Sequence, residues 1–206
     1  MSTRFGYLPV ASALHDPDGL HGFLGDYFAL LDELGGKRRS ADTLLDPAPL
    51  VWLVGTGGTE RKILQYWEQR HRANEYEPVV LLAHHGHNSL AAALETLARL
   101  QQDGAAGRVV YVEGPRDGHG REQVRQAVQD LLVNQALRSA RIGLLGTPSD
   151  WLVASSPEPR AVRNTWGPAV HTIPLDILRE GVARLRNQPV DDIVHALVSK
   201  AAGVDE

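Results

Sequence analysis

LVWLVGTGGTERKIL, residues 50–64, joins an apolar run to a glycine-rich turn and then to a helical pattern. The run 50–54 is apolar throughout, which is typical of a strand buried on both faces of a parallel sheet. The glycines of the turn expose the backbone and permit positive φ. Ile63, Leu64 and Trp67 then share one face of a helix. The stretch therefore predicts a strand–loop–helix unit.

The same unit recurs along the chain. Apolar runs predict six strands, at residues 5–10, 50–54, 79–83, 108–112, 141–145 and 170–173. Apolar stripes at helical spacing fall between them or after the last: Leu90, Leu94 and Leu97; Val124, Val128, Leu131 and Leu132; and Val190, Ile193, Val194, Leu197 and Val198. Strands that alternate with helices predict a parallel sheet with right-handed crossovers. We therefore expect an α/β fold, a flavodoxin-like or Rossmann-like parallel-sheet sandwich.

A domain boundary is expected near Ala140, between a long helical stretch and the strand at 141–145. Residues 1–140 would form an N-terminal α/β domain. Residues 141–206 would begin a second α/β domain, which we expect to be incomplete.

Composition narrows the class of protein. An apolar content of 43% with 22% charged residues is that of an ordinary globular domain. The net charge of -4 gives no basic surface for nucleic acid. The chain has no cysteine, which excludes disulfides and thiolate metal sites. No apolar run approaches the roughly 20 residues that span a bilayer, and the N-terminus lacks a signal-peptide core. We expect a cytoplasmic protein with neither nucleic-acid nor membrane partners.

Three loops after predicted strands are candidates for chemistry, because ligands bind beyond the carboxyl ends of parallel strands. The first is GTGGTE, residues 55–60. It precedes a helix whose free N–H groups favour oxygen-rich ligands, and Thr59 is a suitable N-cap. It is neither a G-x-G-x-x-G nor a Walker loop. A tight turn that only caps the helix explains it equally well.

The second loop is HHGHNS, residues 84–89. Three histidines suggest a metal, but the loop holds no carboxylate or thiolate and matches no zinc spacing. A histidine that faces a polar ligand is the better interpretation. Asn88 or Ser89 would cap the following helix.

The third loop is GTPSDW, residues 146–151, where Ser149 or Asp150 would cap a helix. Trp151 would stack on a sugar or base, or more often would pack in a core or domain interface.

Together these loops resemble the N-terminal half of the L-fucose isomerase/L-arabinose isomerase-like family. LVGTGGTERKIL (53–64) is similar to its strand and T-G-G-T-E turn. VVLLAHHGHNSLAAALETLARL (79–100) is similar to its A-H-x-x-x-N-S-L-x-A-A-L-E segment, with Ala91 where proline is frequent. RIGLLGTPSDWLVASS (141–156) is similar to its I-G-x-x-G-x-P-S-D-W-L-x-A-S segment. The likeness covers about residues 50–176.

The resemblance implies a set of positions that face substrate or a subunit interface. They are Thr56, Gly57, Gly58, Thr59, Glu60, His84, Asn88, Ser89, Ser149, Asp150 and Trp151. It also implies an aldose–ketose isomerase that uses Mn²⁺, with the metal ligands and catalytic carboxylates in later domains that this chain would lack. The chain itself would then supply no metal ligand, no catalytic residue and no cofactor.

Two main interpretations stay open, above a third in which the chain is a purely structural partner that docks through the predicted helix at residues 190–198. In the first, the chain is the N-terminal portion of a sugar isomerase-like protein and contributes substrate-facing loops and subunit interfaces. It would be inactive alone, and its partners would be further copies in a homo-oligomer or a complementary catalytic subunit. If completed by a metal domain, it would be an intramolecular oxidoreductase. In the second, it is a stand-alone, non-catalytic module that binds a sugar or another small polar ligand.

Overall fold

The computed structural model describes residues 5–14, 17–114, 116–185 and 191–201. The chain forms two compact units, Met1–Ala136 and Leu137–Glu206. In the described part of the first unit, one parallel five-stranded sheet has the order β2-β1-β3-β4-β5. Its strands are β1 (Phe5–Val10), β2 (Gly36–Arg38), β3 (Leu50–Val54), β4 (Val79–His84) and β5 (Gly107–Val112).

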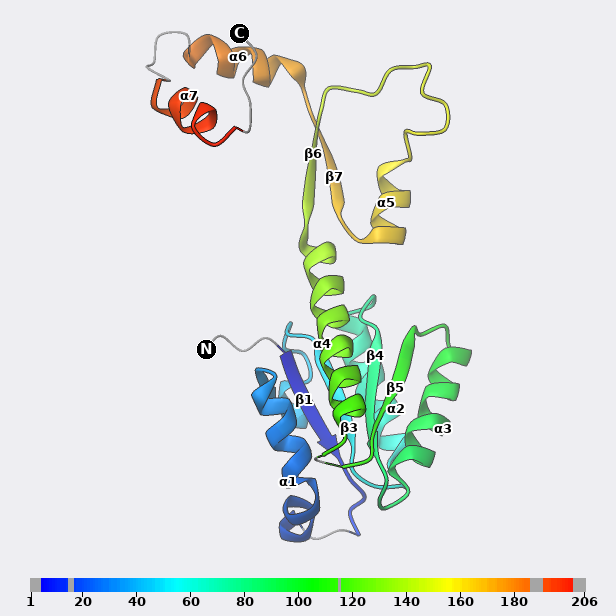
Figure 1. The fold of residues 1–206 in the computed structure, drawn as a ribbon. Helices are drawn as coiled ribbons and strands as arrows, with labels where there is room; N and C mark the ends of the chain where they lie inside the picture. Colours follow the sequence, from blue (N-terminus) through cyan, green and yellow to red (C-terminus); the bar gives the residue numbers. More distant parts are fainter. Residues whose placement is uncertain (1–4, 15–16, 115, 186–190, 202–206) are drawn as a thin grey trace. The chain divides into compact units, whose positions relative to one another are not determined.

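Helices cover both faces of this sheet (Figure 1). The helices α1 (Pro17–Glu33) and α4 (Gly118–Ser139) pack on one face, and α2 (Glu60–Ala73) and α3 (Ser89–Gln102) pack on the other. Side chains that alternate along β3 contribute to the hydrophobic cores on both faces of the sheet. Val51 and Leu53 join the core under α1 and α4, whereas Trp52 joins the core under α2 and α3. The predicted α/β parallel-sheet fold is confirmed.

Predicted and observed strands agree closely. Strands expected at 5–10, 50–54 and 141–145 have those bounds, and β4, β5 and the last strand each gain one residue. Trp52, which lies in the run 50–54 that was expected to be buried, is 2% exposed. Gly104 follows α3 with a φ of 85°, a left-handed conformation that glycine commonly supplies at helix ends. Strand β2 was not predicted, because it is a three-residue edge strand, GKR, without an apolar run.

The second unit contains a parallel pair of strands, β6 (Arg141–Leu145) and β7 (Ala169–Ile173), joined by α5 (Pro159–Trp166). Two further helices follow, α6 (Leu175–Leu185) and α7 (Asp191–Val198). Val190, the first residue of the last predicted stripe, lies outside the described residues.

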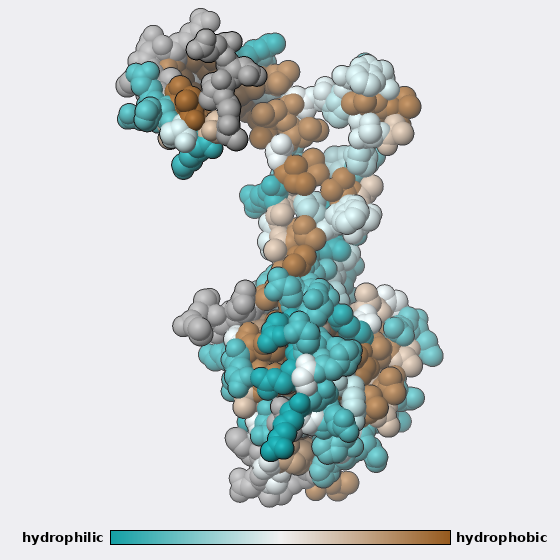
Figure 2. Space-filling view, in the orientation of Figure 1, coloured by the Kyte–Doolittle hydropathy of each residue, from teal (hydrophilic) through white to brown (hydrophobic). Residues whose placement is uncertain are grey.

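Strand β6 corrects one expectation. Its apolar sequence predicts burial on both faces, yet all five residues are exposed, since no helix layer covers them within the described unit. Figure 2 shows apolar side chains gathered on the surface around β6, β7 and α6. Parallel sheets are normally covered on both faces, so this pair is a sheet without its usual partners.

None of the helices in the described ranges is both long enough and apolar enough to cross a bilayer.

Candidate functional site

The strand order places a topological switch point between β1 and β3, since the chain adds β2 on one side of β1 and β3 on the other. Ligands of open α/β sheets bind beyond the carboxyl ends of strands near such a point. Thr56, two residues beyond β3, lies there: its Oγ1 accepts a hydrogen bond from the Ser12 N–H at 2.8 Å. Ser12 comes from the loop after β1 and was not among the predicted site residues.

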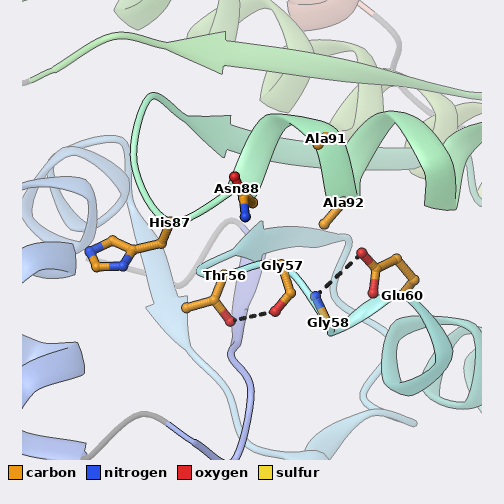
Figure 3. Close-up of a pocket in the computed structure, with 8 residues that line it drawn as sticks. All are labelled: Thr56, Gly57, Gly58, Glu60, His87, Asn88, Ala91 and Ala92. Atoms are coloured by element: carbon orange, nitrogen blue, oxygen red, sulfur yellow. Dashed lines mark hydrogen bonds between the residues drawn. The ribbon is translucent and has the colours of Figure 1, made fainter.

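Beside Thr56 a cleft of about 480 Å³ opens between the β3–α2 loop and the β4–α3 loop (Figure 3). The residues that line it are Thr56, Gly57, Gly58, Glu60, His87, Asn88, Ala91 and Ala92. The helices α2 and α3 begin at its edge, so their first N–H groups favour oxygen-rich ligands there.

The two loops are joined through backbone contacts. The Gly57 N–H donates to the His87 carbonyl oxygen at 2.7 Å. A Cβ on Gly57 would lie 3.0 Å from the Asn88 Cβ, so only glycine allows this approach without displacement. Gly58 has a φ of 74°, a conformation that glycine adopts at little cost. These glycines explain why the turn sequence is GTGG.

The opposite loop is held in a less common backbone conformation. His87 and Asn88 have φ values of 53° and 57°. Non-glycine residues in this left-handed region are uncommon, although asparagine and histidine tolerate it better than most. The His87 ring stacks on Phe23 of α1, with ring centroids 4.2 Å apart. Figure 3 shows the His87 ring directed away from Gly58 and Glu60, and the Asn88 side chain directed between the loops.

His84 lies behind the cleft and not in it. Its side chain is buried, its Nδ1 accepts the Gly86 N–H at 3.1 Å, and its Nε2 lies 3.0 Å from the Gly55 carbonyl oxygen. The acceptor role of Nδ1 assigns the proton to Nε2, which donates to Gly55. Burial lowers the pKa of His84, an effect that the Gly55 carbonyl opposes and that His85 and His87 reinforce. The histidine expected to face a ligand is therefore a neutral link between the ends of β3 and β4.

Ser89 and Thr59 have similar internal roles, because their hydroxyl groups bond to backbone groups at or just beyond the ends of β3 and β4 and do not line the cleft. The Ser89 Oγ donates to the Val54 carbonyl oxygen at 2.5 Å and accepts the His84 N–H at 3.0 Å. The Thr59 Oγ1 donates to the Thr56 carbonyl oxygen at 2.8 Å. Both side chains are fully buried. Thr59 and Asn88 occupy the N-cap positions of α2 and α3, but neither makes a side-chain capping bond.

Glu60 supplies the charge of the cleft. It is the first residue of α2, and its Oε1 accepts the Gly58 N–H at 3.3 Å. With the Asn88 amide it gives the cleft both hydrogen-bond donors and acceptors. The Thr56 hydroxyl is already used within the protein, since it donates to the Gly57 carbonyl oxygen at 3.1 Å and accepts the Ser12 N–H. Such a set matches the hydroxyl groups of a small polar ligand.

The structure thus brings together Thr56, Gly57, Gly58, Glu60 and Asn88 of the predicted residues. It adds three lining residues that were not predicted, His87, Ala91 and Ala92. His87 lay in the histidine loop, but no sequence signal separated it from His84.

Ser149, Asp150 and Trp151 belong to the second unit, and all three are exposed. The expected helix does not begin at Ser149 or Asp150; α5 begins at Pro159 after Glu158. Trp151 is 77% exposed, so the expectation of a core position is wrong within the described structure.

In the described part of the chain, no group of three or more His, Cys, Asp or Glu side chains is arranged to hold a metal ion. The Mn²⁺ that the resemblance implies thus finds no ligand set among these residues.

No protein-family model matches the chain, and no curated protein matches it significantly.

Proposed function

We propose that the chain is the sugar-facing N-terminal portion of an aldose–ketose isomerase-like protein, with the cleft between the β3–α2 and β4–α3 loops as its ligand contact. One observation carries the proposal. The two loops that resemble the isomerase family, 55–60 and 84–89, are the two that form the cleft. Its polar groups suit a polyhydroxylated ligand, because carboxylate and amide side chains exchange hydrogen bonds with sugar hydroxyls.

Isomerisation moves a proton between adjacent carbons and needs general acid–base groups and a polarising metal. In the proposed division of labour, those groups come from a catalytic subunit or region beyond this chain. Glu60 and Asn88 bind and orient the sugar, and Thr56 lines the cleft beside them. The chain alone then binds sugar without turning it over.

A titration of the full chain with a panel of pentoses and hexoses tests the contact. Backbone amide shifts of Gly57, Gly58 and Asn88 should move in a saturable manner with at least one sugar at millimolar concentration. Amides of β2, which is remote from the cleft in the strand order, provide the internal control. If no sugar moves the cleft amides, the proposed contact is wrong.

Two activity assays test the interpretations of the chain: the first, on the chain alone, tests what both expect, and the second, with a catalytic partner, separates them. With aldose and Mn²⁺ the chain alone should form no ketose, and robust turnover would contradict a missing catalytic region. The alternative is a stand-alone sugar-binding module, which is favoured by the confinement of the cleft to a unit with its own two core layers. Ketose formation after addition of a catalytic partner would reject that alternative.

A further inference from the structure

Glu60 differs from its neighbours in the cleft by its charge. Among the eight lining residues it is the single Asp, Glu, Lys or Arg. Arg61 and Lys62 follow it on α2 but do not line the cleft, and the Lys62 ammonium lies 5.9 Å from the Tyr66 ring centroid. The charge that a ligand in the cleft meets at closest range is therefore negative.

The Glu60 carboxylate lies at the amino end of α2, where an anion would otherwise bind favourably. The amino end of a helix carries about half a positive charge and is a common phosphate-binding element. Here the first residue of α2 places a full negative charge at that end and accepts the N–H of Gly58, the residue of the turn with positive φ. Figure 3 shows the Glu60 carboxylate reaching back over Gly58. The Glu60 carboxylate thus accepts the Gly58 N–H, a group that could otherwise donate to a phosphate oxygen.

We infer that Glu60 sets the ligand class of the cleft: it admits uncharged, hydroxyl-rich molecules and excludes phosphorylated ones. The inference rests on the proposed function, because it concerns the same cleft. A carboxylate strengthens hydrogen bonds from neutral hydroxyl groups, since charge-assisted bonds are about twice as strong as neutral ones. The same carboxylate repels a phosphate at contact distance.

Three variants separate charge from shape. Glu60→Gln keeps the size of the side chain and an oxygen that can accept the Gly58 N–H, but it removes the charge. Glu60→Asp keeps the charge on a shorter side chain. Glu75→Gln removes the same charge from the exposed turn before β4, at the other end of that strand from the cleft. It is the matched control for net charge.

The probe is inorganic phosphate. Its binding is measured from the backbone amide shifts of Gly57 and Gly58 and by calorimetry. Glu60→Gln should bind phosphate at least about tenfold more tightly than the unmodified chain. Glu60→Asp and Glu75→Gln should resemble the unmodified chain. Equal phosphate binding by Glu60→Gln and the unmodified chain would overturn the inference, as would an equal gain in Glu75→Gln or in Glu60→Asp. Glu60→Ala is the second neutral variant if Glu60→Gln does not fold.

The phosphate result is independent of the sugar result. If a sugar binds the unmodified chain but Glu60→Gln gains no phosphate affinity, the charge selection fails and the proposed function stands. If no sugar binds but Glu60→Gln gains phosphate affinity, the proposed function fails while Glu60 is still shown to exclude anions.

Discussion

Arg70 of α2 and Glu77 in the loop before β4 form a bidentate ion pair, with Nε 2.5 Å from Oε2 and Nη2 2.7 Å from Oε1. The remaining guanidinium donors bind the carbonyl oxygens of Leu44, Asp46 and Ala48, so all five N–H groups are used. The Arg70 side chain is 3% exposed. One buried cation thus anchors residues 44–48, which lead into β3.

Arg70→Met should lower the free energy of unfolding by about 3–5 kcal/mol, because it leaves Glu77 and three carbonyl groups without their donor. Urea denaturation measures the loss. The matched control is Arg72→Met on the same helix, where the side chain is 75% exposed and pairs with Glu68. That change should cost about 1 kcal/mol or less. Equal losses in the two variants would show that the Arg70 contacts contribute no more than a surface pair.

The second prediction concerns pH and His84. Burial holds the pKa of His84 below its ordinary value of 6.5. Between the lowered folded pKa and 6.5 the unfolded chain binds a proton that the folded chain does not, so the folded state loses stability as the pH falls. The free energy of unfolding then changes by at most about 1.4 kcal/mol per pH unit because of His84. Tyr27, whose ring centroid is 5.1 Å from that of His84, stays neutral, because burial raises its pKa to about 12.

Urea denaturation between pH 5 and 8 measures this slope. His84→Gln should flatten it, because the side chain no longer titrates. His85→Gln, at the adjacent exposed position, is the control and should leave most of the slope in place. A slope that is unchanged in His84→Gln would assign the pH dependence to other groups.

The third prediction tests the close approach of the two cleft loops. Gly57→Ala places a methyl group 3.0 Å from the Asn88 Cβ, so Asn88 must shift by a few tenths of an ångström. We expect that sugar no longer causes amide shifts at Gly58 and Asn88 in this variant. The free energy of unfolding should fall only slightly. Gly25→Ala in α1 is the control, since no atom lies within 4 Å of its added Cβ. It should stabilise the helix slightly and leave sugar binding unchanged. Normal sugar binding by Gly57→Ala would contradict the described loop contact.

The sequence predicted the sheet well because the apolar runs of β1, β3 and β4 have no competing interpretation. It also located the two cleft loops, since glycine and polar residues follow those strands directly. It could not separate Glu60 and Asn88, which line the cleft, from His84 and Ser89, which lie behind it. Those roles depend on hydrogen bonds between β3 and β4, and no local pattern reports a contact between segments about 30 residues apart.

The second unit shows the opposite case, in which a correct strand prediction gave a wrong burial prediction. The run 141–145 forms β6 as expected, but its side chains are exposed. Burial of a parallel strand depends on neighbouring strands and covering helices, which a single segment does not encode.

The fourth prediction follows from that exposed surface. Ile193 and Leu197 of α7 are 64% and 68% exposed, and α5 and α6 also carry exposed apolar side chains. Exposed apolar side chains promote association, because contact removes them from water. We expect concentration-dependent oligomers in light scattering. The double variant Ile193→Lys/Leu197→Lys should shift the distribution toward monomer, whereas Leu14→Lys, at a 94% exposed position of the first unit, should not. A strictly monomeric chain at all concentrations would show that this apolar surface does not drive self-association.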